Sequence, residues 1–248
     1  MGKINTFLAL MFLLLILLST AHAEDTVTLT SLEWPPYSGE QLPAQGASCA
    51  VAKAAFAAMG YHLKIEFYPW SRAVKLAATQ ANYAGYFPEY YSPSVATRFI
   101  LSDPMGTGPL SLAQRRSSPI RWNTIADLSH WRVGVVQDYV NNIEFDQRVA
   151  EHLQPVDVAI NDTLNLKKLA AGRVDLAIVD PYVFDFLAEQ NSQLTSLLEI
   201  NPKIIENKQL YIAFKRTPDG VRWANIFNQG LRKIDVTAIM RQYIKDYR

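Results

Sequence analysis

The chain has 248 residues, of which 49% are hydrophobic, and its 24 basic residues nearly balance its 23 acidic residues. This balance, with no basic stripe or polybasic tail, argues against nucleic acid or an anionic membrane surface as the main partner. The single cysteine, Cys49, excludes an internal disulfide. The scattered histidines and the lack of HExxH and CxxC motifs argue against a transition-metal site, so we expect no cofactor.

The first 23 residues have the pattern of a secretory signal peptide. Lys3 supplies a basic start, residues 7–18 form an unbroken apolar run, and Ala21-His22-Ala23 is a small-x-small cleavage signal. The apolar run is shorter than the roughly 20 residues that a comfortable membrane span needs. We therefore expect cleavage after Ala23 and export to the periplasm, with an uncleaved N-terminal anchor as the alternative.

The mature chain begins with alternating strand and helix patterns. Alternation of apolar and polar residues predicts a strand at 27–32, and an Ala-rich stretch before Gly60 predicts a helix at 48–59. The next expected elements are a strand at 63–68, a helix at 69–79 and a strand at 83–87. This order indicates a mainly parallel sheet covered by helices.

The same pattern restarts after residue 130. The expected elements are strands at 131–136, 156–160 and 174–179, and helices at 141–152, 162–171 and 181–190. The near-continuous apolar run of 174–179 is typical of a buried parallel strand. The tail adds a strand at 209–214 and helices at 218–233 and 236–247.

Two α/β units within one chain predict two lobes. The stretches 110–114 and 200–208 are expected to cross between them, so that the chain leaves the first lobe, builds the second and returns. This gives lobe I residues 24–110 and 205–248, and lobe II residues 115–200. A cleft between two α/β lobes is a preferred site for a small ligand.

Several segments, in order along the chain, carry a family resemblance. They are Trp34-Pro35-Pro36-Tyr37, Pro69-Trp70-Ser71-Arg72-Ala73, Tyr86-Phe87-Pro88, Thr97-Arg98, Leu101-Ser102-Asp103-Pro104, and the stretches 131–137, 171–180 and 227–231. With these segments the chain resembles the periplasmic solute-binding proteins of ABC importers, in the amino-acid-binding group called bacterial extracellular solute-binding protein family 3. The resemblance covers essentially the whole mature chain. It implies a type II two-lobe fold, with two sheets covered by helices and a hinge of two crossing strands.

The chain departs from the family pattern where ligand chemistry lies. Ala84 stands where the family has an aspartate before the glycine. After Gln137, where the family commonly has Gly-Thr or Gly-Ser to hold a carboxylate, this chain has Asp138-Tyr139-Val140. The departures leave the fold and the mode of action intact, but they leave the identity of the ligand open.

The resemblance assigns two charged residues to the ligand. Arg98 matches the family's carboxylate-binding arginine, whose guanidinium can form two parallel hydrogen bonds; the alternative is a surface arginine or a structural ion pair. Asp180 ends the strand at 174–179, where the family's aspartate pairs with the ligand's ammonium group. The alternative for Asp180 is a helix N-cap before Pro181, and both roles can hold at once.

Aromatic residues at loops and helix starts are further candidates, because their faces can sandwich a flat group or attract a cation. Core packing is the alternative for each. The candidates are Trp34, Tyr37 and Trp70, with Phe87 and Tyr139 as weaker ones. Arg72 is expected either to cap the cleft or to be solvated. Tyr90 and Tyr91 are interpreted as an exposed loop packed on itself, with a lid over the ligand as the alternative.

We therefore expect a periplasmic protein, monomeric and without catalytic residues, that captures an amino acid or a related carboxylate for an ABC permease in the inner membrane. One alternative is a soluble ligand sensor that acts with a receptor or kinase. A second is a periplasmic dehydratase of the cyclohexadienyl type, for which Glu33, Glu89 or Asp138 would supply an acid or base.

Overall fold

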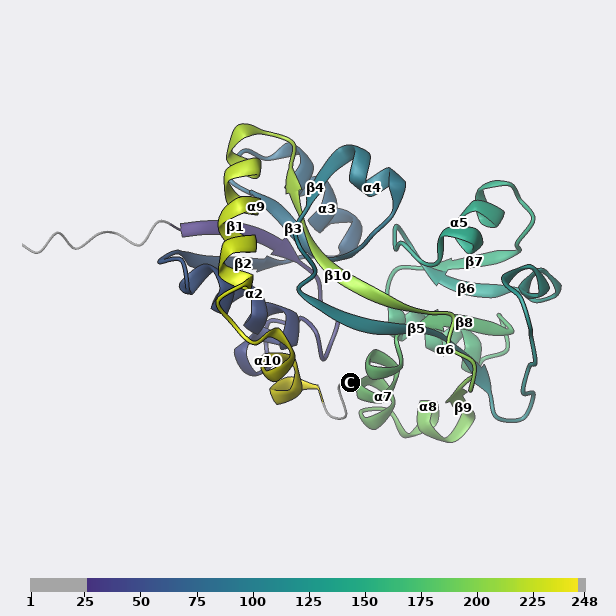
Figure 1. Cartoon of the computed structure of the whole chain (residues 1–248). Coiled ribbons are helices and arrows are strands. Elements are labelled where there is room, and N and C mark those ends of the chain that lie inside the picture. Colours follow the sequence, from purple (N-terminus) through teal and green to yellow (C-terminus); the bar gives the residue numbers. More distant parts are fainter. Residues whose placement is uncertain (1–25, 245–248) are drawn as a thin grey trace, which may run out of the picture.

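The computed structural model describes residues 26–244 (Figure 1). The expected signal peptide, with its cleavage after Ala23, lies outside the described residues, as does the end of the last expected helix. None of the helices within the described range combines the length and the apolar character that a membrane span needs.

The first half of the chain builds a parallel sheet with helices on it. The elements are β1 (Thr26–Ser31), the 3₁₀ helix η1 (Pro43–Gln45), α2 (Ala47–Ala57), β2 (His62–Phe67), α3 (Trp70–Thr79), β3 (Gly85–Tyr90), α4 (Pro93–Arg98) and β4 (Phe99–Leu101). Strand β1 lies between β2 and β3 and is parallel to both. The predicted β-α-β-α-β order is thus observed.

The second half repeats this plan. After the 3₁₀ helix η2 (Ile125–His130) come β6 (Val133–Val136), α5 (Ile143–Ala150), β7 (Val156–Ala159), α6 (Asp162–Ala170), β8 (Leu176–Val179), α7 (Pro181–Glu189), α8 (Ser192–Leu197) and β9 (Leu198–Ile200). Strand β6 is parallel to β7 and β8. Every residue of β8 is buried, as its apolar run predicted.

Two long antiparallel strands connect the halves: β5 (Gly106–Arg115) and β10 (Glu206–Lys215). They pair with each other over the first five residues of each strand. Beyond that stretch, β5 continues alongside β8 and β9, while β10 continues alongside β3 and β4. In Figure 1 they run from one body of the molecule into the other. We call the two bodies lobe I and lobe II, and the lobe limits predicted from the sequence remain the division that we propose.

The chain returns to lobe I with α9 (Pro218–Leu231) and α10 (Val236–Tyr243). Phe227 of α9 packs against Phe56 of α2 and Phe214 of β10, with ring centres 5.3 and 6.2 Å apart. Cys49 is fully buried in α2. Burial raises the pKa of its thiol to about 12, so it behaves as a packed apolar side chain.

Strand β3 extends further than the sequence predicted. The expected strand ended at residue 87, since proline lacks the N–H that a central strand needs. In the structure Pro88 lies inside the strand, where the pairing with β10 shifts register between Tyr211 and Ala213. Such a bulge accommodates the missing donor. As a result Glu89 and Tyr90 belong to a strand whose six residues are all buried.

Candidate functional site

The carboxyl ends of the parallel strands in both lobes lead to one cleft. In open parallel sheets ligands bind beyond this edge, where loops and helix starts supply the side chains. Hydrogen bonds join the two lobes here, among them those from the Tyr37 hydroxyl to Asp180 and from the Trp70 indole to the Asp138 carbonyl. We take this interlobe cleft as the candidate functional site.

The loop that follows β1 presents two aromatic rings to the cleft. Trp34 and Ser38 form an antiparallel bridge, and the Ser38 hydroxyl donates a hydrogen bond of 2.9 Å to the Leu32 carbonyl. The rings of Trp34 and Tyr37 are stacked, with centres 4.5 Å apart. Trp34 also meets Tyr90 edge to face at 6.0 Å, which extends this aromatic wall to the end of β3.

Asp180 links the two lobes and also caps a helix. Its Oδ2 accepts a hydrogen bond of 2.9 Å from Tyr37, and its Oδ1 accepts from the backbone N–H groups of Tyr182 at 2.7 Å and Val183 at 3.3 Å. The N-cap interpretation of Asp180 is therefore confirmed. Burial raises the pKa of Asp180 to about 7, although the three hydrogen bonds favour the charged form.

Trp70 and Tyr139 make the second contact between the lobes. The Trp70 Nε1 donates a hydrogen bond of 2.9 Å to the Asp138 carbonyl, and its ring meets that of Tyr139 edge to face at 5.8 Å. Asp138 adopts a φ of 61°, a left-handed conformation that aspartate tolerates better than most residues. The Tyr139 hydroxyl in turn donates to Asp162 at 3.1 Å.

The centre of the cleft is nearly filled by these side chains. The inner cavity measures about 20 Å³, which is room for about one water molecule. It is lined by Leu32, Trp34, Trp70, Pro88, Glu89, Tyr90, Tyr139, Val140 and Leu210. Two outer hollows of about 710 and 740 Å³ flank it, and Tyr139 lines all three spaces. A solute larger than a water molecule fits into the inner cavity only when these aromatic side chains, or the lobes that carry them, move.

Buried charge is concentrated at this cleft. Four charged side chains among residues 26–244 are buried: Glu89, Asp162, Asp180 and Lys208, exposed by 4, 6, 2 and 4%. Lys208 lies on β10 with its Nζ 5.4 Å from the centre of the Tyr90 ring and 3.5 Å from Glu206. The buried charged groups are thus three carboxyl groups and one ammonium group.

The environment of each carboxyl group favours its neutral form. Glu89 accepts hydrogen bonds from the Tyr86 hydroxyl at 2.9 Å and from the Tyr90 backbone N–H at 2.7 Å. Burial nevertheless raises the pKa of Glu89 to about 7, and it raises that of Asp162 to about 6. A positive charge in the cleft would favour the ionised carboxylates.

The structure brings together most of the site residues predicted from the sequence. Trp34, Tyr37, Trp70, Tyr139 and Asp180 meet at the two interlobe contacts. Arg98 lines the outer hollow of about 740 Å³, where it is exposed and its Nε lies 3.4 Å from the Ser94 carbonyl.

The two remaining predicted residues lie away from the inner cavity. Phe87 is fully buried, and it lines none of the three spaces of the cleft. Arg72 is exposed, and its guanidinium lies over the Tyr68 ring at 5.0 Å. Whether either contacts a ligand stays a prediction.

Sequence reasoning missed three residues of the cleft as ligand-site candidates, Glu89, Asp162 and Lys208, and it placed Tyr90 at the ligand only through the alternative of a lid. The interpretation of Tyr90 as part of an exposed loop is wrong, because it is 7% exposed on β3, whereas its neighbour Tyr91 is 46% exposed. Asp162 is the first residue of α6, as Trp70 is of α3, so the argument from helix starts would have found it. Glu89 was considered only as a catalytic group, and Lys208 only as part of a crossing stretch.

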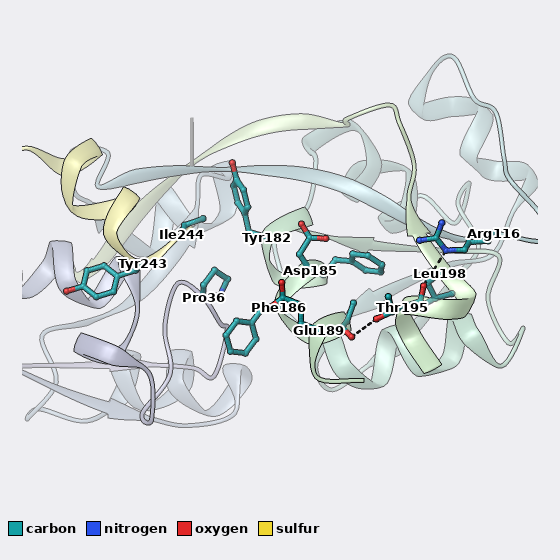
Figure 2. A pocket seen from close by; sticks show the side chains of 12 residues that line it. Pro36, Arg116, Tyr182, Asp185, Phe186, Glu189, Thr195, Leu198, Tyr243 and Ile244 are labelled. Atoms are coloured by element: carbon teal, nitrogen blue, oxygen red, sulfur yellow. Dashed lines mark hydrogen bonds between the residues drawn. The ribbon is translucent and has the colours of Figure 1, made fainter. Parts of the chain in front are cut away.

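Another hollow, of about 540 Å³, lies between α7 and α8 on one side and Pro36 and α10 on the other (Figure 2). Its charged side chains, Arg116, Asp185 and Glu189, are all exposed. None of the buried charged groups lines it. Within residues 26–244, no three histidine, cysteine, aspartate or glutamate side chains are gathered so as to hold a metal ion.

Comparisons with solved structures agree with this architecture. A histidine kinase sensor domain with similarity to periplasmic binding proteins matches with a TM-score of 0.76 and 18% identity, over 90% of this chain and 97% of that one. An ancestral arginine-binding protein bound to arginine matches with a TM-score of 0.74 and 15% identity, over 90% and 99% of the two chains.

A third match is the ancestral amino acid-binding protein AncCDT-1, described as a precursor of cyclohexadienyl dehydratase. Its TM-score is 0.68 at 15% identity, over 89% of this chain and 95% of that one. No protein-family model matches the chain, and no curated protein sequence matches it. At these identities the likeness is one of fold, and it confirms the type II, two-lobe fold of periplasmic binding proteins.

Proposed function

We propose that this protein captures a small polar solute between its two lobes in the periplasm and delivers it to an ABC permease. The observation that carries the proposal is the meeting of polar groups from both lobes in one closed cleft, with Tyr37 bonded to Asp180 at 2.9 Å. A solute that touches both lobes favours the closed form by its differential affinity for that form. Binding therefore changes the shape that a permease would recognise.

The size of the inner cavity supports a hinge motion as part of binding. About 20 Å³ cannot hold an amino acid, so the lobes open before a solute enters. The paired stretch of β5 and β10 is the connection about which they would move. Several of the matched structures are amino-acid-binding proteins, so amino acids are the first class of solute to test. The ammonium group of an amino acid would suit the acidic side chains of the cleft.

A sensor that acts with a receptor or kinase is the second candidate, because a histidine kinase sensor domain shares this fold over 97% of its length. The two functions differ in the step after binding. Deletion of the gene should abolish uptake of the radiolabelled solute if the protein serves a permease. It should instead abolish a transcriptional response, with uptake intact, if the protein serves a sensor.

The binding step is tested by a thermal-shift screen with amino acids, amines, oligopeptides and organic acids. A solute that binds only the folded protein raises the melting temperature by mass action. Hits are then examined by small-angle scattering, where we expect a decrease in the radius of gyration relative to the open form. If no solute of any class stabilises or compacts the protein, the proposed function is wrong.

A further inference from the structure

We propose that the solute recognised in this cleft is an organic cation held through its ammonium groups, and that it needs no carboxylate. The inference rests on the proposed function and specifies the chemistry of the solute. Its basis is the set of side chains around one buried hydroxyl group, that of Tyr90.

The Tyr90 hydroxyl is a buried polar group without a partner. Its side chain lines the inner cavity and is 7% exposed, and its oxygen forms no hydrogen bond with any described residue. A buried hydroxyl left unpaired costs about 1–3 kcal/mol. This atom therefore marks a place where a ligand atom with hydrogen-bonding capacity would be stabilised.

Carboxyl groups from both lobes act on that hydroxyl through their charge, and one of them, Glu89, lines the same cavity. Burial raises the pKa of Tyr90 well above its usual range, and the negative charges of Asp180, Asp162, Glu89 and Glu206 raise it further. Among residues 26–244, Lys208 is the one buried base, and it already lies close to Glu206. An additional anion in this space would meet repulsion from several sides, whereas a cation would neutralise the excess negative charge.

Aromatic rings complete a surface suited to a cation. Trp34, Trp70, Tyr90 and Tyr139 all line the inner cavity. Their faces carry negative potential and attract ammonium groups. An ammonium group also offers up to three N–H donors, which match the Tyr90 oxygen and the remaining acceptor positions of Glu89 in the inner cavity. Asp162 lines the outer hollow of about 710 Å³, where it offers an acceptor to a second ammonium group of an extended cation.

The groups that would hold a carboxylate already form other hydrogen bonds or lie outside the inner cavity. The backbone N–H of Tyr139 donates to the Val136 carbonyl at 3.2 Å, so it is not directed at a solute. Arg98 is exposed in the outer hollow and is not part of the inner lining. The three buried acids are not arranged to hold one metal ion, which favours an extended organic cation.

The test compares amino acids with the same molecules lacking the carboxylate: lysine with cadaverine, and arginine with agmatine. Titration calorimetry on the purified protein measures each affinity. We expect cadaverine or agmatine to bind at least as tightly as its parent amino acid. Binding of lysine or arginine without binding of the matched amine overturns the inference and leaves the proposed function standing.

Variants locate the cation in the cleft. Glu89→Gln and Asp162→Asn should each weaken binding of the amine on the order of tenfold or more, since a hydrogen bond to a charged group is lost. Tyr90→Phe should weaken binding without lowering the melting temperature of the ligand-free protein, because it removes an unpaired hydroxyl. Asp219→Asn, an exposed change on α9, serves as the matched control.

Other binding results would overturn the inference. Amine binding that is unchanged in all three cleft variants places the cation elsewhere. Binding of glutamate or another anion in preference to the amines contradicts a cation site, while a compaction on binding would still support solute capture. If no solute binds, both proposals fall together.

Discussion

The hydroxyl of Tyr37 lies where the two lobes touch, and its hydrogen bond to Asp180 spans them. Tyr37→Phe keeps the ring, with its stacking on Trp34, and removes only this bond. A buried carboxyl group then loses one of its donors. We expect the free energy of unfolding to fall by about 1–3 kcal/mol at neutral pH, measured by urea denaturation, and the ligand-free particle to become more open in small-angle scattering.

Tyr91→Phe is the matched control for this change, because Tyr91 is 46% exposed at the edge of the same lobe. Its stability should stay within about 0.5 kcal/mol of the parent, as is usual for surface substitutions. If the two variants lose the same stability, the bond between Tyr37 and Asp180 does not hold the lobes together.

The sequence identified those site residues that follow from general rules of α/β sheets. Asp180 was predicted because it ends an apolar strand, and Trp34 and Trp70 because they begin a loop and a helix. Glu89 and Tyr90 could not be placed in the same way, since the expected strand ended before them, at residue 87. Their burial depends on a register shift against β10, which no local pattern records.

At the scale of elements, α7 depends on Asp180 for its N-cap, so the structural and ligand roles of this residue need separate tests. Asp180→Ala removes the cap and should lower the free energy of unfolding by about 1 kcal/mol or more. Asp180→Asn keeps a good capping side chain and should lose much less stability. If the residue also binds the solute, both variants should lose affinity in calorimetry. If the Asp180→Asn protein binds the solute with the parental affinity, Asp180 acts only as a helix cap.

Strand β5 carries a glycine whose missing side chain makes room for the interlobe contact. A Cβ at Gly108 would lie 2.6 Å from both the Asp180 Oδ2 and the Tyr37 hydroxyl. Both atoms belong to side chains that meet across the cleft and not to backbone, so Gly108→Ala should separate the pair rather than unfold the strand. We expect a near-parental circular dichroism spectrum with a more open particle in small-angle scattering. A particle as compact as the parent would contradict this.

The order of the elements was predicted well, and their extents less so. Seven β-strands and their helices were found from alternation, apolar runs and turn residues. The hinge strand β5 was expected only as a short crossing stretch at 110–114, whereas it spans ten residues. Its pairing partners come from both lobes, so its length is determined by contacts distant in sequence. The short elements α4, β4, α8 and β9 were missed for the same reason.

At the scale of the whole molecule, the two lobes bring three acids into one closed and poorly solvated space. We therefore expect their ionisation to be coupled to closure. Glu89 and Asp180 ionise near pH 7, and Asp162 near pH 6, because burial raises the pKa of each. Lys208 lowers the pKa of Glu89 through its charge, as does Arg98, but both effects are smaller than that of burial.

These shifts predict opposite effects of pH on the ligand-free protein and on binding. In the unfolded chain the three carboxyl groups ionise near pH 4, so between about pH 4 and 7 the folded form holds more protons. Their contribution to stability is therefore greatest at the acid end of this window and decreases as the pH rises through it.

Binding of cadaverine needs ionised carboxylates and should strengthen from about pH 5 to 8, where its amines stay protonated. Scanning calorimetry and titration calorimetry over this range measure the two trends, and Glu89→Gln should flatten both. Affinity that falls as the pH rises would show that the solute does not enter as a cation paired with these acids.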